Sequence, residues 1–158
     1  MTGGGVWKTT NGGLAWTPVS DSIGVGSIGA VAAAPSNGDV VWVGSGEANN
    51  MRSSSWGVGV FKSTDYGVSW SLLPSTSGAQ ATAFTGEWQY VHRVAIDPSE
   101  AINDEVYAAV YGFIERSTDG GATWTRVLGD AVTQSRYTDV VVSSTGVVYA
   151  SLSRDGGT

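Results

Sequence analysis

One eight-residue pattern occurs three times in this 158-residue chain, at a constant spacing of 54 residues. The pattern is S/T-x-D/N-x-G-x-x-W, and its copies begin at Thr9, Ser63 and Ser117. A fixed period is the signature of repeat architectures, in which each period forms one supersecondary unit. The repeat therefore constrains the fold more than any other feature. Its matching positions are Thr9, Asn11, Gly13 and Trp16, then Ser63, Asp65, Gly67 and Trp70, then Ser117, Asp119, Gly121 and Trp124.

Each copy is predicted to be the turn of a β-hairpin. Asp or Asn folds its side chain onto the turn backbone, and Gly supplies a position with positive φ. Two further β-like runs lie between successive copies, which makes four strands per period. The expected strands are Val6–Lys8, Trp16–Val19, Ile28–Ala34, Val40–Gly44, Val60–Lys62, Trp70–Leu73, Val91–Ile96, Glu105–Val110, Phe113–Arg116, Trp124–Leu128, Thr138–Val142 and Val147–Leu152.

Four antiparallel strands per repeat are typical of a β-propeller blade. The sequence thus predicts an all-β fold, a β-propeller segment of about three blades' worth. We expect complete blades at residues 28–73 and 91–128, and half blades at residues 3–20 and 138–158. Ser153–Gly157 matches the start of the pattern, but it follows a second strand directly, so we interpret it as a loop.

Composition agrees with this class and excludes several functions. Glycine contributes 23 residues and charged residues only 14%, as in turn-rich β-structure. A net charge of −6 disfavours binding to nucleic acid phosphates. The chain has no Cys for disulfides or thiolate metal sites, no apolar run that could span a membrane and no export signal. No cofactor or metal motif is present, so we predict neither.

The three copies resemble the BNR or Asp-box repeat family, in which this motif marks the turn between the third and fourth strands of propeller blades. The segments Val41–Asn50 and Gly59–Asp65 look like those of bacterial secreted proteins with sortilin-like or glycoside-hydrolase-like propellers. The resemblance implies an extracellular or cell-surface parent protein. It also implies a structural role for the Asp-box residues, because their side chains are needed within their own turns.

A propeller closes its ring with about four to eight blades. We therefore expect the chain to be a piece of a longer propeller, whose secreted parent carries its signal peptide upstream. The alternative is that two copies associate head to tail through their half blades and form a six-bladed ring.

Up-and-down connection of the strands would place the Asp-box turns at one end of the blades and the longer loops at the other. Those loops are expected at Ser45–Gly59, Pro74–Tyr90 and Gly129–Tyr137. We place mixed aromatic, polar and charged groups in them, which suit a sugar-binding surface. Lys8, Lys62 and Arg116 are expected to face solvent. The ligand-binding candidates are Asn49, Asn50, Arg52, Trp56, Trp88, Tyr90, His92, Arg93, Asp130, Arg136 and Tyr137.

Two functions from different classes remain open. The first is a binding or scaffold module for glycans or protein partners. The second is part of a glycoside hydrolase, xyloglucanase-like or sialidase-like, with Glu47 and Glu87 as candidate carboxylates and with the site completed by blades outside this chain. A third hypothesis, similarity to photosystem-associated Asp-box assembly factors, is disfavoured by the acidic balance.

Overall fold

The computed structural model describes residues 4–47, 55–80, 82–99, 105–129 and 135–154. Within these ranges the regular structure is β-strand, with three short 3-10 helices. The helices are η1 (Asp21–Ile23), η2 (Pro74–Thr76) and η3 (Glu87–Gln89). The strands are β1 (Trp7–Lys8), β2 (Thr17–Pro18), β3 (Ile28–Ala33), β4 (Val41–Ser45), β5 (Val60–Ser63), β6 (Ser71–Leu72), β7 (Val91–Ile96), β8 (Val106–Val110), β9 (Phe113–Ser117), β10 (Thr125–Leu128), β11 (Ser135–Val142) and β12 (Val148–Arg154).

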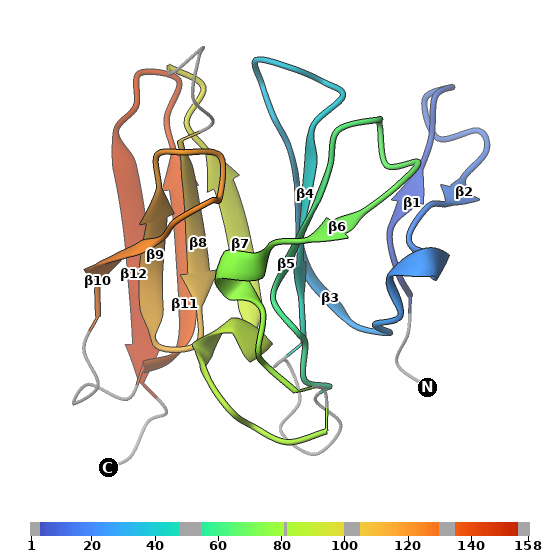
Figure 1. Cartoon of the computed structure of the whole chain (residues 1–158). Coiled ribbons are helices and arrows are strands. Elements are labelled where there is room, and N and C mark those ends of the chain that lie inside the picture. Colours follow the sequence, from blue (N-terminus) through green and yellow to red (C-terminus); the bar gives the residue numbers. More distant parts are fainter. Residues whose placement is uncertain (1–3, 48–54, 81, 100–104, 130–134, 155–158) are drawn as a thin grey trace.

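These strands form four antiparallel sheets that stand side by side (Figure 1). Strands β3 to β6 make one four-stranded sheet in chain order, and β7 to β10 make the next. The two-stranded sheets β1–β2 and β11–β12 lie at opposite ends of the row (Figure 1). This arrangement confirms the predicted partial propeller, with two complete blades between two half blades. We call the β3–β6 sheet blade 2 and the β7–β10 sheet blade 3.

The blades also repeat their irregularities. The pairing of β3 with β4 shifts register between Ile28 and Ala30, and the pairing of β7 with β8 shifts between Val91 and Arg93. Both shifts fall near the start of the first strand of a blade. A bulge at this point re-aims the side chains that follow it.

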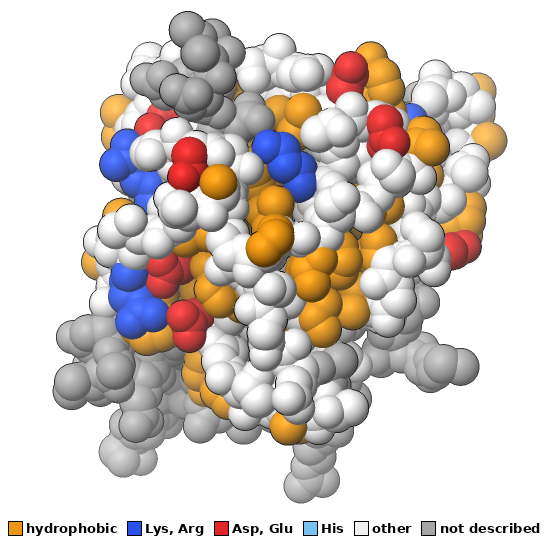
Figure 2. Space-filling model, in the orientation of Figure 1, with side chains coloured by type: hydrophobic (Ala, Val, Ile, Leu, Met, Phe, Trp, Pro, Cys, Tyr) orange, Lys and Arg blue, Asp and Glu red, His pale blue; other side chains and the backbone are white. Residues whose placement is uncertain are grey.

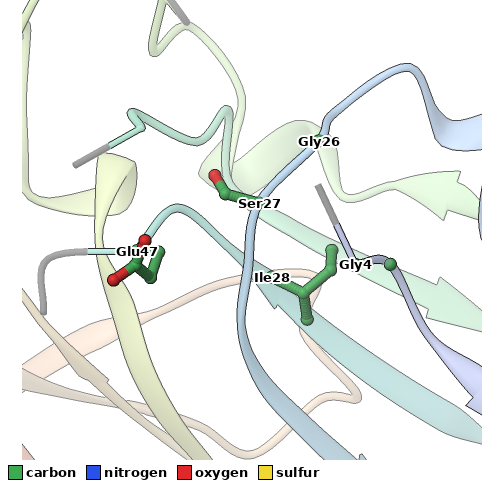
Figure 3. Close-up of a pocket in the computed structure, with 6 residues that line it drawn as sticks. Gly4, Gly26, Ser27, Ile28 and Glu47 are labelled. Carbon is green, nitrogen blue, oxygen red and sulfur yellow. The ribbon is translucent and has the colours of Figure 1, made fainter. Parts of the chain in front are cut away.

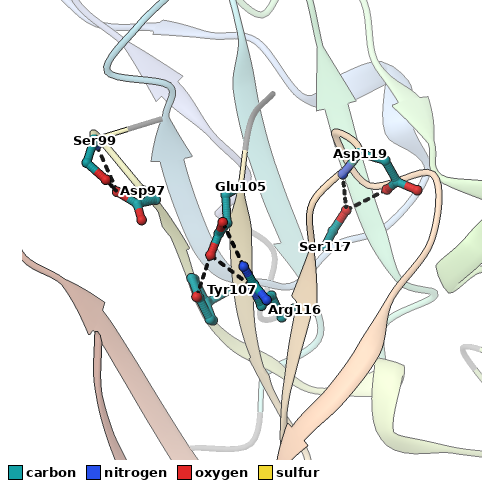
Figure 4. Close-up of polar contacts among 7 residues, drawn as sticks. All are labelled: Asp97, Ser99, Glu105, Tyr107, Arg116, Ser117 and Asp119. Carbon is teal, nitrogen blue, oxygen red and sulfur yellow. Dashed lines mark hydrogen bonds and ion pairs between the residues drawn. The ribbon is translucent and has the colours of Figure 1, made fainter. Parts of the chain in front are cut away.

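The Asp-box turns are closed by a network between side chains and backbone, of which Figure 4 shows the contacts between Ser117 and Asp119. The buried Ser117 hydroxyl donates to Asp119 Oδ1 at 2.8 Å and accepts the Gly121 amide at 2.8 Å. Asp119 in turn accepts the Thr123 amide at 2.9 Å. The turn around Asp65 repeats these contacts within 0.1 Å: the corresponding distances are 2.7, 2.8 and 2.9 Å.

The first turn uses an amide in place of the carboxylate. Asn11 Oδ1 accepts a hydrogen bond from the hydroxyl of Thr9 at 3.0 Å and from the amide of Ala15 at 2.9 Å. The turn therefore keeps the same hydrogen bonds although Asn11 is uncharged. In all three turns the hydroxyl and the Asp or Asn side chain therefore make their hydrogen bonds within their own turn.

The same turns lock each blade to the one before it. A Cβ on Gly121 would lie 2.9 Å from the buried ring of Trp42 in blade 2, so this turn of blade 3 fits closely against the preceding blade. Lys62 Nζ donates to the Gly120 carbonyl at 3.1 Å, and Ser75 Oγ donates to the Gly121 carbonyl at 2.6 Å.

The lysines were therefore wrongly expected to be only solvent-facing charges. Lys62 reaches the following Asp-box turn, and Lys8 does the same one period earlier by donating to the Tyr66 carbonyl at 2.9 Å. Arg116, the third member of the series, forms an ion pair with Glu105 at 2.8 Å within its own blade (Figure 4). The two lysines reach the neighbouring turn because its backbone carbonyl groups are good acceptors for a cation.

Apolar side chains fill the spaces between the sheets. The larger core cluster joins blades 2 and 3 through Trp42, Val60, Val91 and Val106, among others. A smaller cluster joins blade 3 to the β11–β12 sheet and includes Tyr107, Ile114 and Val140. On the face shown in Figure 2, apolar side chains also surface in the middle of the view, where the blades meet.

The hairpin turns and the longer loops lie at opposite ends of the blades (Figure 1). The Asp-box turns and the turns between first and second strands share one end, which we call the Asp-box end. Helix η3 and the loops between blades lie at the other, which we call the loop end. Strand β11 begins at Ser135, so Arg136 and Tyr137 belong to a strand and not to the loop in which they were predicted. Ser153 and Arg154 were predicted to begin a loop, but they are the last two residues of strand β12, because they continue its pairing with β11. The rest of the predicted loop, residues 155–157, lies outside the described ranges.

We predict that Gly121→Ala lowers the free energy of unfolding by about 2–4 kcal/mol, because a methyl group would overlap Trp42 and φ is +89°. Gly38→Ala is the matched control, since no atom lies within 4 Å of its Cβ position, and it should change stability by less than ~0.5 kcal/mol. Urea unfolding of both variants measures this. Equal stabilities would contradict the close fit between blades.

We predict a pH-dependent loss of stability that originates in two Asp-box carboxylates. Hydrogen bonds from Ser69 and Thr123 lower the pKa of Asp65 and of Asp119 from 3.8 to about 2. Their stabilisation is complete above the unfolded-state pKa and is lost as pH falls through the folded-state value. Wild-type stability should therefore fall between about pH 4 and pH 2 more steeply than that of Asp65→Asn/Asp119→Asn. Parallel slopes in acid denaturation would refute this origin.

Candidate functional site

Aromatic rings gather at the loop end where blade 3 meets the β11–β12 sheet. The rings of Phe84, Tyr90 and Tyr111 lie 5.0–6.1 Å apart between centroids. His92 continues the series at 6.5 Å from Tyr90, and Tyr137 follows at 6.0 Å from His92. We call these five residues the loop-end cluster. Such contacts are within the range of favourable aromatic pairs.

Five different segments of the chain bring these rings together. Phe84 comes from the loop before η3, Tyr90 from the residue after it, and His92 from β7. Tyr111 occupies the tight turn between β8 and β9, and Tyr137 lies on β11. Tyr90 is 8% exposed and anchors the cluster, whereas Phe84 is 49% exposed and offers its ring to solvent.

Tyr90 also links the cluster to the neighbouring loop. Burial raises the pKa of its hydroxyl, and a hydrogen bond with Trp56 opposes that rise. The negative charge of Glu47 raises the pKa of Tyr90 further. Of the predicted candidates, the structure thus brings Trp56, Tyr90, His92 and Tyr137 to one region, with Glu47 close enough to act on Tyr90 electrostatically.

A buried glutamine holds the loop that carries Phe84. The Gln89 side chain is fully buried and accepts the amides of Thr85 and Gly86, the latter at 3.1 Å. Its Nε2 donates to the carbonyls of Gln80 and Ala83. One side chain therefore satisfies four backbone groups and fixes the approach to the cluster.

Glu47 lines a shallow pocket beside the β1–β2 sheet (Figure 3). The pocket has a volume of about 230 Å³, and its other walls are Gly4, Gly5, Gly26, Ser27 and Ile28. Three of these are glycines, so the lining combines backbone groups with the side chains of Ser27, Ile28 and Glu47. The Glu47 amide donates to the Ser55 carbonyl at 3.0 Å, which draws the two ends of its loop together.

Glu87, the other candidate carboxylate, belongs to a different environment. It forms an ion pair with Arg126 at 3.2 Å, and Arg126 also pairs with the buried Glu115 at 3.0 Å. Burial raises the pKa of Glu115, and the charge of Arg126 counteracts it. The Arg126 guanidinium stacks on Phe113, 3.4 Å from the ring centroid. Glu87 is thus paired within blade 3, while Glu47 lines the pocket that it shares with residues 4–5 and 26–28.

Two further candidates have structural partners. Trp88 packs edge-on against Trp124 at 5.2 Å and joins the larger core cluster. Arg93 forms a two-pronged contact with Asp139 of β11 at 2.8 and 3.3 Å, which ties blade 3 to the next sheet. These residues support the site through packing and do not contribute to the loop-end cluster.

Several predicted candidates lie beyond what the structure describes. Asn49, Asn50, Arg52 and Asp130 fall outside the described residues, and for Arg136 only the backbone is described. Sequence reasoning in turn missed Phe84, Gln89 and Tyr111. Tyr111 could have been found from the sequence. It precedes a glycine in the turn between a second and a third strand, and such turns are expected at the loop end. Phe84 and Gln89 could not have been found in this way, since neither belongs to the repeat.

The described residues provide neither a metal site nor a membrane-spanning helix. No group of three or more His, Cys, Asp or Glu side chains is placed to hold a metal ion in the described part of the chain. The described ranges likewise contain no helix long and apolar enough to cross a membrane.

Blade-like antiparallel sheets in a row, with Asp-box turns at one end and an aromatic cluster at the other, define a segment of a β-propeller. No protein-family model and no curated protein matches the sequence. Among solved structures, an ancestral GH74 enzyme matches with a TM-score of 0.70 and 24% identity, over 94% of this chain and 19% of that chain. This match supports the fold, and this chain spans about a fifth of that enzyme's length.

Two other solved structures match less closely. A GH74 enzyme from Niastella koreensis has a TM-score of 0.46 at 18% identity, over 94% of this chain and 30% of that one. YCF48 from Cyanidioschyzon merolae has a TM-score of 0.46 at 16% identity, over 78% and 33% of the two chains.

We predict that Gln89→Leu loosens the loop before η3, because the amides of Thr85 and Gly86 lose their acceptor. Amide exchange at these two residues should accelerate about tenfold or more, and stability should fall by ~1–3 kcal/mol. Gln80→Leu is the control, since Gln80 enters the network through its main chain. Unchanged exchange in Gln89→Leu would contradict the anchoring role.

Proposed function

We propose that this chain is part of an Asp-box β-propeller that binds glycans, with the loop-end cluster as the binding surface. The observation that carries the proposal is the gathering of five rings from separate elements at one end of the blades. Aromatic rings pack against the apolar faces of sugars, while hydroxyl and imidazole groups hydrogen-bond to sugar hydroxyls. The Asp-box resemblance further supports an extracellular or cell-surface location for the parent protein.

The arrangement favours a sugar over a generic apolar ligand. Three tyrosines and one histidine give the cluster polar tips on a ring surface, and the half-exposed Phe84 adds an apolar one. Tyr90 is held rigidly by burial and by Trp56, so little side-chain entropy is lost when a ligand binds. Glycans are therefore a better match than protein partners, which would require a larger continuous apolar patch.

A second candidate function is part of a glycoside hydrolase. The observation that favours it is Glu47, a carboxylate at the rim of a pocket close to the cluster. A hydrolase needs two carboxylates across the bond that it cleaves. Because Glu87 is paired with Arg126 in blade 3, the second carboxylate would have to come from blades outside this chain. The ancestral GH74 enzyme shares the fold, which makes this function a reasonable alternative for the parent protein.

We predict that Phe84→Ala weakens glycan binding about tenfold, a loss of ~1.4 kcal/mol, because it removes the most exposed ring of the cluster. Tyr66→Ala is the control: Tyr66 is 53% exposed, similar to Phe84 at 49%, but belongs to an Asp-box turn. Ligands are first found on a glycan array that includes xyloglucan oligosaccharides and sialyllactose. Calorimetry then measures their affinities for wild type and both variants.

The outcomes separate the two functions. Binding that Phe84→Ala weakens and Tyr66→Ala does not, without release of reducing ends, supports the binding module. Release of reducing ends that Glu47→Gln abolishes would support the hydrolase instead. If no glycan binds, or if both aromatic variants bind equally well, the loop-end cluster is not a glycan site.

A further inference from the structure

The main-chain carbonyl of Glu87 holds two parts of the loop-end cluster together. It accepts the amide of Tyr90, which follows η3, and the amide of Tyr111, which lies in the turn between β8 and β9, each at 3.3 Å. The rings of these two tyrosines lie 5.9 Å apart between centroids, and both contact the ring of Phe84. The position of Glu87 therefore sets the spacing of three rings that come from separate segments of the chain.

Helix η3, which begins at Glu87, depends on its neighbours for its position. It contains three residues, and so short a 3-10 helix has too few internal hydrogen bonds to be stable by itself. Trp88 packs it against Trp124 of the third Asp-box turn, with 5.2 Å between ring centroids. A second contact is the ion pair between the Glu87 carboxylate and Arg126 of β10, at 3.2 Å.

Arg126 is itself held in place by strand β9. It lies opposite Glu115 in the pairing of β10 with β9, and its Nε donates to the Glu115 carboxylate at 3.0 Å. Its guanidinium carbon lies 3.4 Å from the centroid of the Phe113 ring. Most exposed ion pairs contribute little to stability, because two mobile side chains must be ordered. Arg126 is already ordered by two contacts, so pairing with Glu87 costs it little further side-chain entropy.

The two carboxylates that Arg126 contacts have different surroundings. The side chain of Glu115 is 7% exposed, so its contact with Arg126 neutralises a buried charge within the β9–β10 strand pair. The side chain of Glu87 is 31% exposed and belongs to the segment that leads into Tyr90. The first contact therefore stabilises a blade, whereas the second reaches the segment that positions the rings.

We propose that Arg126 is a positioning residue for the loop-end cluster. Through Glu87 it fixes η3, and η3 fixes the separation of the rings of Tyr90, Tyr111 and Phe84. Arg126 thus affects ligand recognition without touching the ligand. The effect on affinity rests on the proposed glycan binding, whereas the effect on the ligand-free protein does not.

The variants that test this role separate the two contacts of Arg126. Replacing Arg126 alone would leave the buried charge of Glu115 unpaired and would destabilise blade 3. Glu115→Met/Arg126→Met instead replaces that pair by apolar side chains, an exchange that folded proteins often tolerate. Glu115→Met is the matched control, because Arg126 remains available to Glu87. Glu87→Arg/Glu115→Met/Arg126→Glu reverses the ion pair between positions 87 and 126 and should restore its effect.

Amide exchange in the ligand-free 158-residue chain is the first measurement. In Glu115→Met/Arg126→Met, the amides of Tyr90 and Tyr111 should exchange about fivefold faster than in wild type, equivalent to ~1 kcal/mol for the loss of a well-ordered ion pair. The amide of Trp42 should keep its wild-type rate, because β4 is paired within blade 2. Glu115→Met and the reversed pair should show wild-type rates at all of these amides.

Calorimetry with xyloglucan oligosaccharides as the probe is the second measurement. Glu115→Met/Arg126→Met should bind the probe about fivefold more weakly than wild type. Glu115→Met and the reversed pair should bind it within about twofold of wild type, because both keep an ion pair at position 87.

The exchange rates decide the proposal even if the glycan function is wrong. Wild-type rates at Tyr90 and Tyr111 in Glu115→Met/Arg126→Met would overturn it. Equal acceleration at Trp42, or acceleration that the reversed pair does not correct, would show a general loss of stability and would also overturn it. If wild type does not bind the probe, the glycan function loses support and the exchange rates alone decide the role of Arg126. Faster exchange with unchanged affinity would refute the part of the proposal that concerns recognition.

Discussion

The hydroxyl that begins each Asp-box turn is the interaction on which the stacking of the blades depends. In the second and third turns it comes from a buried serine, which donates to the carboxylate and accepts a glycine amide at the same time. That glycine is held at positive φ, and its missing side chain leaves room for the previous blade. A local turn therefore sets the distance between two sheets, because Gly121 can approach Trp42 only in this conformation.

The aromatic and basic residues that repeat beside the turns extend this effect from one blade to the next. Lys62 joins three features at once: its own strand pair, the Trp42 ring, and a carbonyl of the following turn. Such a shared contact makes neighbouring blades interdependent, as expected for repeat proteins whose stability resides in the interfaces between units.

The two ends of the blades differ in what their side chains contact. The Asp-box end is built from short turns whose side chains are used within the turns themselves. At the loop end, longer connections converge on Tyr90 and Gln89, which are buried and hold the rings of Phe84 and Tyr111 in place. A rigid scaffold with variable loops at one end is a common basis for ligand recognition, and it leaves the fold unchanged while the ligand varies.

The period, the strands and the hairpin turns of the described residues could be predicted from the sequence, since these depend on local chemistry: β-branched runs, Asp-box side chains and glycines. The sequence also placed Tyr90, His92 and Tyr137 among the candidates. The pairing of Glu87 with Arg126 and the contact of Phe84 with the cluster follow from the packing of the folded chain, because these contacts link residues that no repeat relates. Loop side chains outside the period acquire their partners only when the blades are assembled.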